Sequence, residues 1–302
     1  MDYQLWKLFV DAYELGSLSK VAQSYRVSQP KISRQLNELE DSCHAKLFHR
    51  NGRGVILTDF GQALLPKIKS WLEHTEHLKQ DILNASGDII GSVRMGSIPS
   101  MSYPILTQVI QSLKQTYPKI ELSVREGQGI LVDQWLEEGS IDLGLLYRFN
   151  PTAHVLDDYL RRSVTYVIGH CEDALMNNAR TIRLTDLNQQ PLVTFCQPHP
   201  FLNLLQSAAQ QHQMDLNLVF QVDSIRMQLN LIQRNHYYGL LGEQAVNSYL
   251  REFPTLTYAQ LVEPELPRYL SLSLPPQAYL SPACKVVIQT IKKVLLLNQT
   301  AI

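Results

Sequence analysis

The chain has 302 residues, and its hydrophobic content of 45% is that of a globular protein with enough apolar side chains for two or three cores. Its formal net charge of -1 argues against a protein that coats nucleic acid indiscriminately, because such proteins carry a large positive surplus. No basic and apolar leader begins the chain and no apolar run is long enough to span a bilayer, so we expect a cytoplasmic protein.

The cysteines and histidines show no spacing typical of a metal site. The four cysteines are far apart in the sequence, so we expect reduced thiols rather than a disulfide framework or a Cys-rich zinc site. Cys43, His44 and His49 come nearest to a metal-binding cluster, and we expect packing and phosphate contact from them instead. No metal and no cofactor are expected. The cysteines are Cys43, Cys171, Cys196 and Cys284.

Residues 1–58 have the pattern of three helices followed by a hairpin. A first amphipathic helix ends at Gly16, since glycine readily takes the left-handed conformation that commonly closes a helix. A second helix follows Ser17, which can cap it. A third follows Ser28 and has Pro30 in its first turn, where a missing N–H costs nothing. This order predicts a helix-turn-helix.

The third helix has one apolar and one polar face. Ile32, Leu36 and Leu39 recur at helical spacing and are expected in the core. A helix-turn-helix places the first part of this helix in the major groove, so the polar face predicts contacts with base edges or phosphates. An ordinary solvated face is the alternative, because amphipathic helices are common. The polar face comprises Pro30, Ser33, Arg34 and Asn37.

A basic hairpin is expected after the third helix. Asn51-Gly52 lies between two short strands and is a strong signal for a tight turn. Arg50 and Arg53 on either side of it suit phosphates or a minor groove. The segment 16–58 contains seven basic residues against three acidic ones, a surplus of four positive charges. We interpret the hairpin as the wing of a winged helix-turn-helix.

This region resembles the LysR-type transcription regulators, and the matching residues follow one another in the family's order without gaps. His44 departs from the family, which usually has Gly at the end of the recognition helix; we expect the turn to survive, because histidine can adopt the left-handed conformation at a cost. The matching residues are Phe9-Val10, Gly16-Ser17-Leu18, Val21-Ala22, Val27-Ser28-Gln29-Pro30, Ile32-Ser33-Arg34-Gln35-Leu36, Leu39-Glu40, Leu47-Phe48, Arg50, Leu57-Thr58 and Gly61. The residues expected to contact DNA are Ser17, Ser28, Gln29, Pro30, Lys31, Ser33, Arg34, Asn37, Arg50 and Arg53.

One long helix is expected from Thr58, which can cap it, to about Asn84. With Thr75 included, its seam residues alternate spacings of four and three over about three heptads, a coiled-coil pattern that predicts a partner helix. Packing against the chain's own body is the alternative. In LysR-type proteins this segment is the dimerisation helix, and the resemblance implies a homodimer that pairs again into a tetramer. The seam residues are Leu64, Ile68, Trp71, Leu78 and Ile82.

From Gly91 onward, strands alternate with helices in the order that produces a parallel sheet, and further strands as far as Leu241 build a second lobe. The expected fold class is therefore α/β. The resemblance extends here more loosely and implies a two-lobed effector domain like a periplasmic binding protein. The expected domains are 1–58 for DNA binding, 59–89 for the linker helix and 90–302 for the regulatory domain, with lobe one at about 90–160 and 266–302 and lobe two at about 161–265.

Two such lobes place a cleft at the carboxyl ends of their strands. We expect a small carboxylate-bearing metabolite there, held by hydroxyls and free backbone N–H groups at Ser100 and Ser102, at the start of the helix that contains Leu106. Polar helix caps are the alternative for these residues. Asn235 and Tyr237 replace glycines usual in the family and are large enough to reshape the cleft. The expected effector-binding residues are Ser97, Ser100, Met101, Ser102, Gln128, Thr194, Cys196, Gln197, Asp223 and Ser224.

The function expected is a sequence-specific DNA-binding regulator controlled by a small molecule, with promoter DNA, the effector, further copies of the chain and RNA polymerase as partners. A nucleoid protein without effector is the alternative that also binds DNA. A solute-binding protein would need a signal peptide, and an enzyme would need a catalytic motif; G-x-S-x-G, P-loop, dinucleotide and H-E-x-x-H motifs are all absent from the sequence. Asp157-Asp158 is interpreted as a solvated loop.

Overall fold

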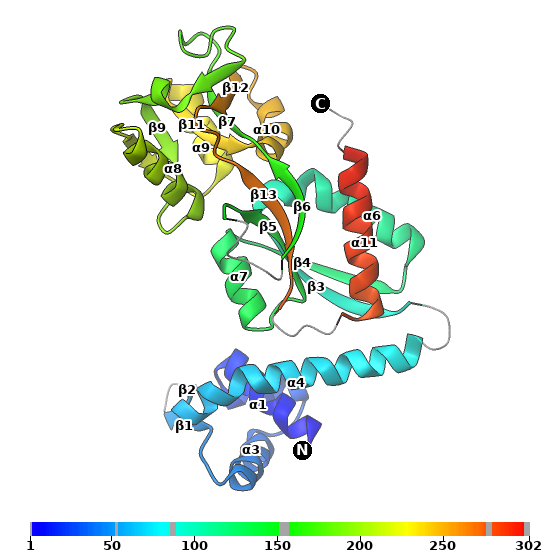
Figure 1. Ribbon diagram of the computed structural model, residues 1–302. Helices are drawn as coiled ribbons and strands as arrows, with labels where there is room; N and C mark the ends of the chain where they lie inside the picture. Colours follow the sequence, from blue (N-terminus) through cyan, green and yellow to red (C-terminus); the bar gives the residue numbers. More distant parts are fainter. Residues whose placement is uncertain (1, 52–53, 85–88, 151–156, 276–279, 299–302) are drawn as a thin grey trace. The chain divides into compact units, whose positions relative to one another are not determined.

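The computed structural model describes residues 2–51, 54–84, 89–150, 157–275 and 280–298 (Figure 1). The chain divides into two compact units, residues 1–88 and 89–302. Within the described ranges, no helix is both long and apolar enough to cross a membrane.

The amino-terminal unit has three short helices, a hairpin and one long helix. Gly16 closes the first helix with a φ of 63°, and His44 closes the third with a φ of 51°, so the expected turn forms in spite of the histidine side chain. The hairpin strands are antiparallel, with Phe48 opposite Leu57. The elements are α1 (Tyr3–Leu15), α2 (Leu18–Tyr25), α3 (Gln29–Cys43), β1 (Phe48–Asn51), β2 (Gly54–Leu57) and α4 (Asp59–Asn84).

The long helix α4 is partly built into the core of this unit. Thr58 Oγ1 accepts a hydrogen bond from Gly61 N at 3.0 Å and so caps the helix. Ile68 is only 4% exposed and belongs to the apolar cluster of α1 and α3, whereas Leu78 and Ile82 are 60% and 67% exposed. The first half of the predicted seam is therefore covered by its own unit, and only the second half presents free apolar surface.

The first lobe of the regulatory unit is a five-stranded sheet in the order β4-β3-β5-β13-β6. β3 is parallel to β4 and β5, which confirms the expected α/β grammar, and β13 is antiparallel to β5 and β6. Helices α6 and α11 cover one face of the sheet and α7 the other (Figure 1). The elements are β3 (Gly91–Ser97), α5 (Pro99–Met101), the turn η1 (Ser102–Leu106), α6 (Thr107–Thr116), β4 (Ile120–Glu126), α7 (Gly129–Glu137), β5 (Leu143–Arg148), β6 (Asp158–Ser163), β13 (Arg268–Ser273) and α11 (Pro282–Leu297).

The helix predicted around Leu106 is interrupted. Tyr103 has an extended backbone, with φ -133° and ψ 134°, so the long helix α6 begins only at Thr107. Ser100 lies in the three-residue helix α5 and Ser102 in the turn after it. The expectation that these two serines begin a long helix is wrong, because α6 starts after them at Thr107.

The second lobe is a six-stranded sheet in the order β10-β9-β11-β7-β12-β8. Its core includes Phe201, Leu229 and Leu240. The elements are β7 (Thr165–His170), β8 (Thr181–Arg183), η3 (Leu184–Leu187), β9 (Pro191–Thr194), α8 (Pro200–Gln211), β10 (Asn217–Gln221), α9 (Ile225–Asn235), β11 (Tyr238–Gly242), α10 (Glu243–Tyr249), η4 (Leu250–Glu252) and β12 (Leu256–Val262).

The chain passes between the lobes twice, from β6 to β7 and from β12 to β13, and these strands run side by side where the lobes meet (Figure 1). Arg148 at the end of β5 is buried beside this crossing and is bound by Asp157 at 2.5 Å and Asp133 at 2.7 Å. The interpretation of Asp157-Asp158 as a solvated loop is wrong, because the Asp157 side chain is only 6% exposed and Asp158 begins β6.

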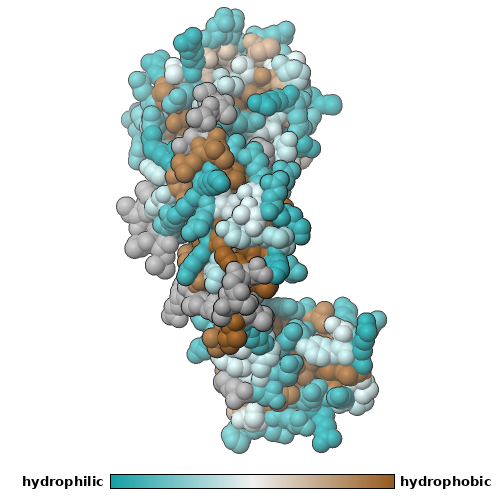
Figure 2. All heavy atoms as spheres, turned by 90° about the vertical axis from the view of Figure 1, so that its right-hand side faces the viewer, coloured by the Kyte–Doolittle hydropathy of each residue, from teal (hydrophilic) through white to brown (hydrophobic). Residues whose placement is uncertain are grey.

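The surface seen in Figure 2 is largely polar over the regulatory unit, with apolar atoms gathered near the carboxyl-terminal end of α11. Leu296 and Leu297 there are 64% and 67% exposed. Leu295, one residue earlier, is buried in the core of lobe one. Leu296 and Leu297 therefore lie on the solvent-facing side of this amphipathic helix, where polar residues are usual.

Candidate functional site

The wing and the recognition helix α3 are joined by one arginine. Arg50 on β1 donates from Nη1 to Ser33 Oγ and from Nη2 to Asn37 Oδ1, both at 2.6 Å. Ser33 and Asn37 lie one turn apart on the outward face of α3. Three of the residues expected to contact DNA therefore form one connected polar surface.

Arg34 lies beside this surface with its side chain 84% exposed. Its Nε contacts Glu38 Oε1 at 3.2 Å, an i,i+4 pair in full contact with solvent. Such exposed pairs contribute little to stability and exchange partners readily. The guanidinium is thus available for a base edge or a phosphate without disturbing the core.

The buried carboxylate of Glu40 fixes the inner side of the same helix to the wing. Glu40 is 2% exposed, and its Oε1 accepts hydrogen bonds from Leu47 N at 2.9 Å and Phe48 N at 3.1 Å, while Lys46 Nζ lies 2.8 Å from Oε2. Burial acts to raise the pKa of Glu40, but the hydrogen bonds from Lys46 and the two amides outweigh it, and the pKa is lower than usual. The carboxylate therefore stays ionised and orients the start of the hairpin.

The remaining residues expected at DNA lie at the starts of α2 and α3, except for one in the wing. Gln29, Pro30 and Lys31 are exposed in the first turn of α3. Ser17 and Ser28 precede α2 and α3, and neither hydroxyl accepts a capping hydrogen bond from its own helix. Arg53 lies outside the described residues.

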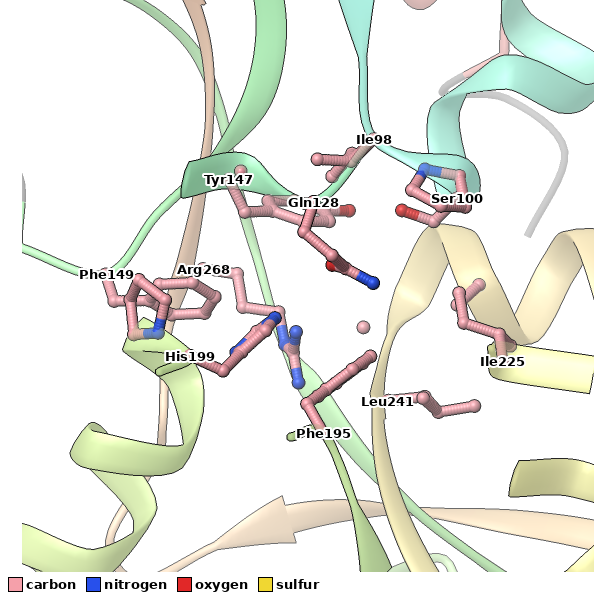
Figure 3. Close-up of a pocket in the computed structure, with 15 residues that line it drawn as sticks. Ile98, Ser100, Gln128, Tyr147, Phe149, Phe195, His199, Ile225, Leu241 and Arg268 are labelled. Atoms are coloured by element: carbon pink, nitrogen blue, oxygen red, sulfur yellow. The ribbon is translucent and has the colours of Figure 1, made fainter. Parts of the chain in front are cut away.

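The regulatory unit has a pocket between its two lobes, drawn in Figure 3. The space between its walls is about 600 Å³, a volume that includes open solvent at its mouth. The lining is mostly apolar with a few polar groups. It consists of Ile98, Pro99, Ser100, Gln128, Gly129 and Tyr147 from lobe one, Phe149 between the lobes, Phe195, His199, Pro200, Ile225, Leu241, Gly242 and Ala245 from lobe two, and Arg268 at the start of β13.

Two nitrogen-bearing side chains converge on one wall of this pocket. Arg268 donates from Nε to Thr165 Oγ1 at 3.0 Å and contacts Leu240 O from Nη2 at 3.4 Å, and its guanidinium lies 3.8 Å from the ring centre of Phe201. His199 stacks on Phe195 with ring centres 4.2 Å apart and planes within 9°. Figure 3 shows both polar ends directed toward the cavity.

Burial shifts the pKa of both groups. Desolvation lowers the pKa of Arg268 to about 10, which leaves it charged at neutral pH. Desolvation, and after it the positive charge of Arg268, lower the pKa of His199 to about 4, so the imidazole is neutral.

Hydrogen bonds tie the lobes together around the pocket. Gln128 Nε2 donates to Asp223 O at 3.2 Å, and Tyr249 Oη donates to Pro99 O at 3.2 Å. Each joins lobe one to lobe two and lies at the pocket or next to a residue that lines it. A ligand that changes the spacing of the two walls would have to stretch or replace these contacts.

Only two of the ten residues predicted to bind an effector, Ser100 and Gln128, line the pocket. Ser102 donates to Ile98 O at 3.4 Å, Cys196 N donates to Asp223 Oδ1 at 3.1 Å, and Ser224 caps α9. These three residues therefore act as helix caps and turn contacts, which was the alternative to effector binding. Outside the lining lie Ser97, Met101, Ser102, Thr194, Cys196, Gln197, Asp223 and Ser224.

Asn235 and Tyr237 also lie outside the pocket lining. Asn235 Nδ2 donates to Leu231 O at 3.0 Å within α9, and the Tyr237 ring is 6.0 Å from that of Phe220 at the sheet edge. Both side chains are directed to other parts of lobe two.

The sequence analysis did not predict Arg268, His199 or the aromatic residues of the pocket lining, which are Tyr147, Phe149 and Phe195. A usable signal was present for His199, which follows a predicted buried strand and precedes Pro200 in the first turn of a helix. None existed for Arg268, because its hydrogen-bond partner Thr165 lies 103 residues earlier in the chain. Among the described residues, no group of three or more His, Cys, Asp and Glu side chains is arranged to hold a metal ion.

Two family models match this chain. The model of the bacterial regulatory helix-turn-helix protein, lysR family, matches residues 3–62, and the model of the LysR substrate binding domain matches residues 86–296.

Similar proteins include the uncharacterized HTH-type transcriptional regulator YvbU of Bacillus subtilis (strain 168), which is 27% identical over 95% of this chain and 96% of its own length. The nitrogen assimilation regulatory protein nac of Escherichia coli (strain K12) is 23% identical over 98% of this chain and 95% of its own.

Among solved structures, a full-length OxyR variant from Pseudomonas aeruginosa superposes with a TM-score of 0.75 at 18% identity, covering 97% of this chain and 98% of the other. Full-length CbnR complexed with its target DNA superposes with a TM-score of 0.68 at 18% identity, covering 97% of this chain and all of the other. These two likenesses concern the fold. The two family models together span most of the chain, and it therefore belongs to the LysR family of DNA-binding transcriptional regulators that respond to small-molecule effectors and oligomerise, and it is not an enzyme.

Proposed function

We propose that the effector of this regulator is a small carboxylate-bearing metabolite and that it binds in the pocket between the lobes. The observation that carries the proposal is the pocket itself, which takes lining residues from both lobes, most of them apolar. Ser100 and Gln128 supply polar contacts from lobe one. A ligand in this position touches both walls at once, so its binding energy depends on how the lobes are arranged.

The same argument connects the pocket to transcription. If the effector binds one arrangement of the lobes more tightly than another, it shifts the population toward that arrangement, and DNA affinity changes by the reciprocal coupling. Typical couplings of about 1–3 kcal/mol change an equilibrium about 5- to 150-fold. That range suffices to switch a promoter.

On the DNA side, we propose that α3 reads the major groove through Gln29, Pro30, Ser33 and Arg34, with Arg50 and Arg53 of the wing on the backbone or minor groove. Two copies joined along the exposed half of α4 would read a pseudo-palindrome with half-sites about one helical turn apart or a multiple of it. Pairing of dimers into a tetramer, a contact with RNA polymerase and a cytoplasmic location belong to the same proposal.

The test begins with genome-wide mapping of bound DNA, which supplies the operator and, through the neighbouring genes, a set of metabolites. Footprints of the full chain on that operator are then titrated with each metabolite. Ile225→Trp, which fills the pocket from lobe two, should abolish the metabolite response and keep binding of DNA in its absence. Tyr258→Trp, at an exposed position of the same lobe, is the matched control. A normal response from Ile225→Trp would contradict the pocket assignment.

A further inference from the structure

Arg268 is one of the two arginines buried among the described residues, and its surroundings differ from those of the other. It is 4% exposed, and its hydrogen-bond partners are a threonine hydroxyl and a backbone carbonyl. Arg148 is 6% exposed and is bound by two carboxylates at 2.5 and 2.7 Å. The protein neutralises one buried guanidinium and leaves the other without an anion.

No carboxylate in the described part of the chain pairs with Arg268. The segments 151–156 and 276–279 of this unit contain no acidic residue in the sequence. A charge held in a low-dielectric interior without a counter-ion is costly, and natural proteins pair such charges. The ring of Phe201 offsets part of the cost, but an aromatic face does not replace an anion.

The uncompensated charge faces the effector pocket. Figure 3 shows the guanidinium of Arg268 pointing into the cavity beside His199 and Phe195. Nη1 has no hydrogen-bond partner among the described residues, whereas Nε and Nη2 are held by lobe two. A donor with a free N–H and a full positive charge therefore lies on the pocket wall.

His199 adds a second donor at the same place. Its Nδ1 accepts a hydrogen bond from Phe201 N at 3.2 Å, so in the neutral imidazole the proton is on Nε2. The ring is kept neutral by burial and by Arg268, and its stacking on Phe195 fixes the direction of that N–H. One cation and one neutral donor on an aromatic wall suit a group with a single negative charge.

Resting on the proposed effector pocket, we infer that Arg268 and His199 bind the charged group of the effector, which is a monoanion with a flat or branched apolar body. Ile98, Ile225 and Leu241 contact that body from the other walls. Ser100 and Gln128 are then left for an uncharged polar group of the ligand. The charge is recognised at the junction of the lobes and not at the serines of lobe one.

The inference is tested by thermal unfolding of the full chain with acids and amides of the same shape: benzoate with benzamide, and isovalerate with isovaleramide. Each acid should stabilise the wild-type protein at a concentration at least about 10-fold lower than its amide needs, because a hydrogen bond to a charged group contributes more than a neutral one. Arg268→Met should abolish this preference. Arg268→Lys keeps the charge and should keep the preference at reduced affinity.

The ligand-free variants supply a second readout. Removing an unpaired buried charge should raise the unfolding temperature of Arg268→Met, whereas Arg148→Met orphans two carboxylates and should lower it. A lowered unfolding temperature for Arg268→Met together with an intact preference for acids would overturn the inference. Equal stabilisation of the wild-type protein by acids and amides would overturn it and leave the pocket in place. If no compound of a wider library, acidic or neutral, changes the unfolding temperature, both the proposed pocket and this inference are overturned.

Discussion

Replacing Glu40 tests whether a buried carboxylate holds the wing to the recognition helix. Its Oε1 accepts from the buried amides of Leu47 and Phe48, and Lys46 contacts Oε2. In Glu40→Ala both amides lose their acceptor at a cost of about 1–3 kcal/mol each, so the free energy of unfolding should fall by about 2–6 kcal/mol. The exposed end of the Lys46 pair adds little. In Glu40→Gln the carbonyl oxygen still accepts from both amides, and the loss should be about 1–2 kcal/mol.

The assay is urea unfolding followed by tryptophan fluorescence in a Trp135→Phe background. The remaining tryptophans, Trp6 and Trp71, both lie in the amino-terminal unit, so the signal reports that unit alone. Asp41→Ala, at the exposed neighbouring position, should change stability by less than about 0.5 kcal/mol. Glu40→Ala within the same margin of the parent would refute the reasoning.

The pH dependence of the same measurement has a fixed sign. Because folding lowers the pKa of Glu40, its contribution is present above the ordinary value of 4.5 and is lost as the pH falls through the folded-state value. The stability difference between the parent and Glu40→Gln should therefore shrink on acidification below about pH 4.5 and be constant near neutrality. A difference that grows on acidification would be inconsistent with an ionised, hydrogen-bonded carboxylate.

Three further outcomes are expected. Arg34→Ala should cost about 1–3 kcal/mol at one operator position, while Arg50→Ala should weaken binding to all sequences and reduce the salt slope by about one; identical footprints and salt slopes for both would contradict the separate roles. Leu78→Glu should shift the protein toward monomer in sedimentation with its amino-terminal unit still folded, whereas the exposed control His74→Glu should not. Tyr249→Phe removes one hydrogen bond between the lobes and should change effector affinity about 2- to 10-fold by calorimetry, and an unchanged affinity would show that this contact does not limit closure.

The sequence was most informative where local chemistry decides the outcome. Helical periodicity, Gly16 and the Asn51-Gly52 turn predict the helix-turn-helix and its wing, because caps and tight turns depend on neighbours within a few residues. The alternation of strands and helices in the first lobe is equally predictable from the sequence, and the structure buries β5 along its whole length. Strands β6, β12 and β13 were not predicted, since their pairing is set by partners far along the chain.

The partners of a buried residue cannot be predicted from the periodicity of the sequence. A pattern of apolar residues shows which face is covered and says nothing of what covers it, so Ile68 could be assigned equally well to a partner helix or to its own unit. The sequence predicted a solvated loop at Asp157, because its ion pair with Arg148 forms only in a fold that buries both side chains. Arg268 meets Thr165, Leu240 and Phe201 only after two lobes have formed.

The burial of Ile68 connects the first half of α4 to the core of the DNA-reading unit. With 26 residues rising about 1.5 Å each, this helix is about 39 Å long. Turning such a rod by about 5° displaces its far end by about 3 Å, close to the 3.4 Å rise of one base pair. Because Ile68 is buried in the apolar cluster of this unit, we expect a rotation of α4 to move the recognition helix with it. A bend of the promoter could then be set in steps of a base pair by motions smaller than a side chain.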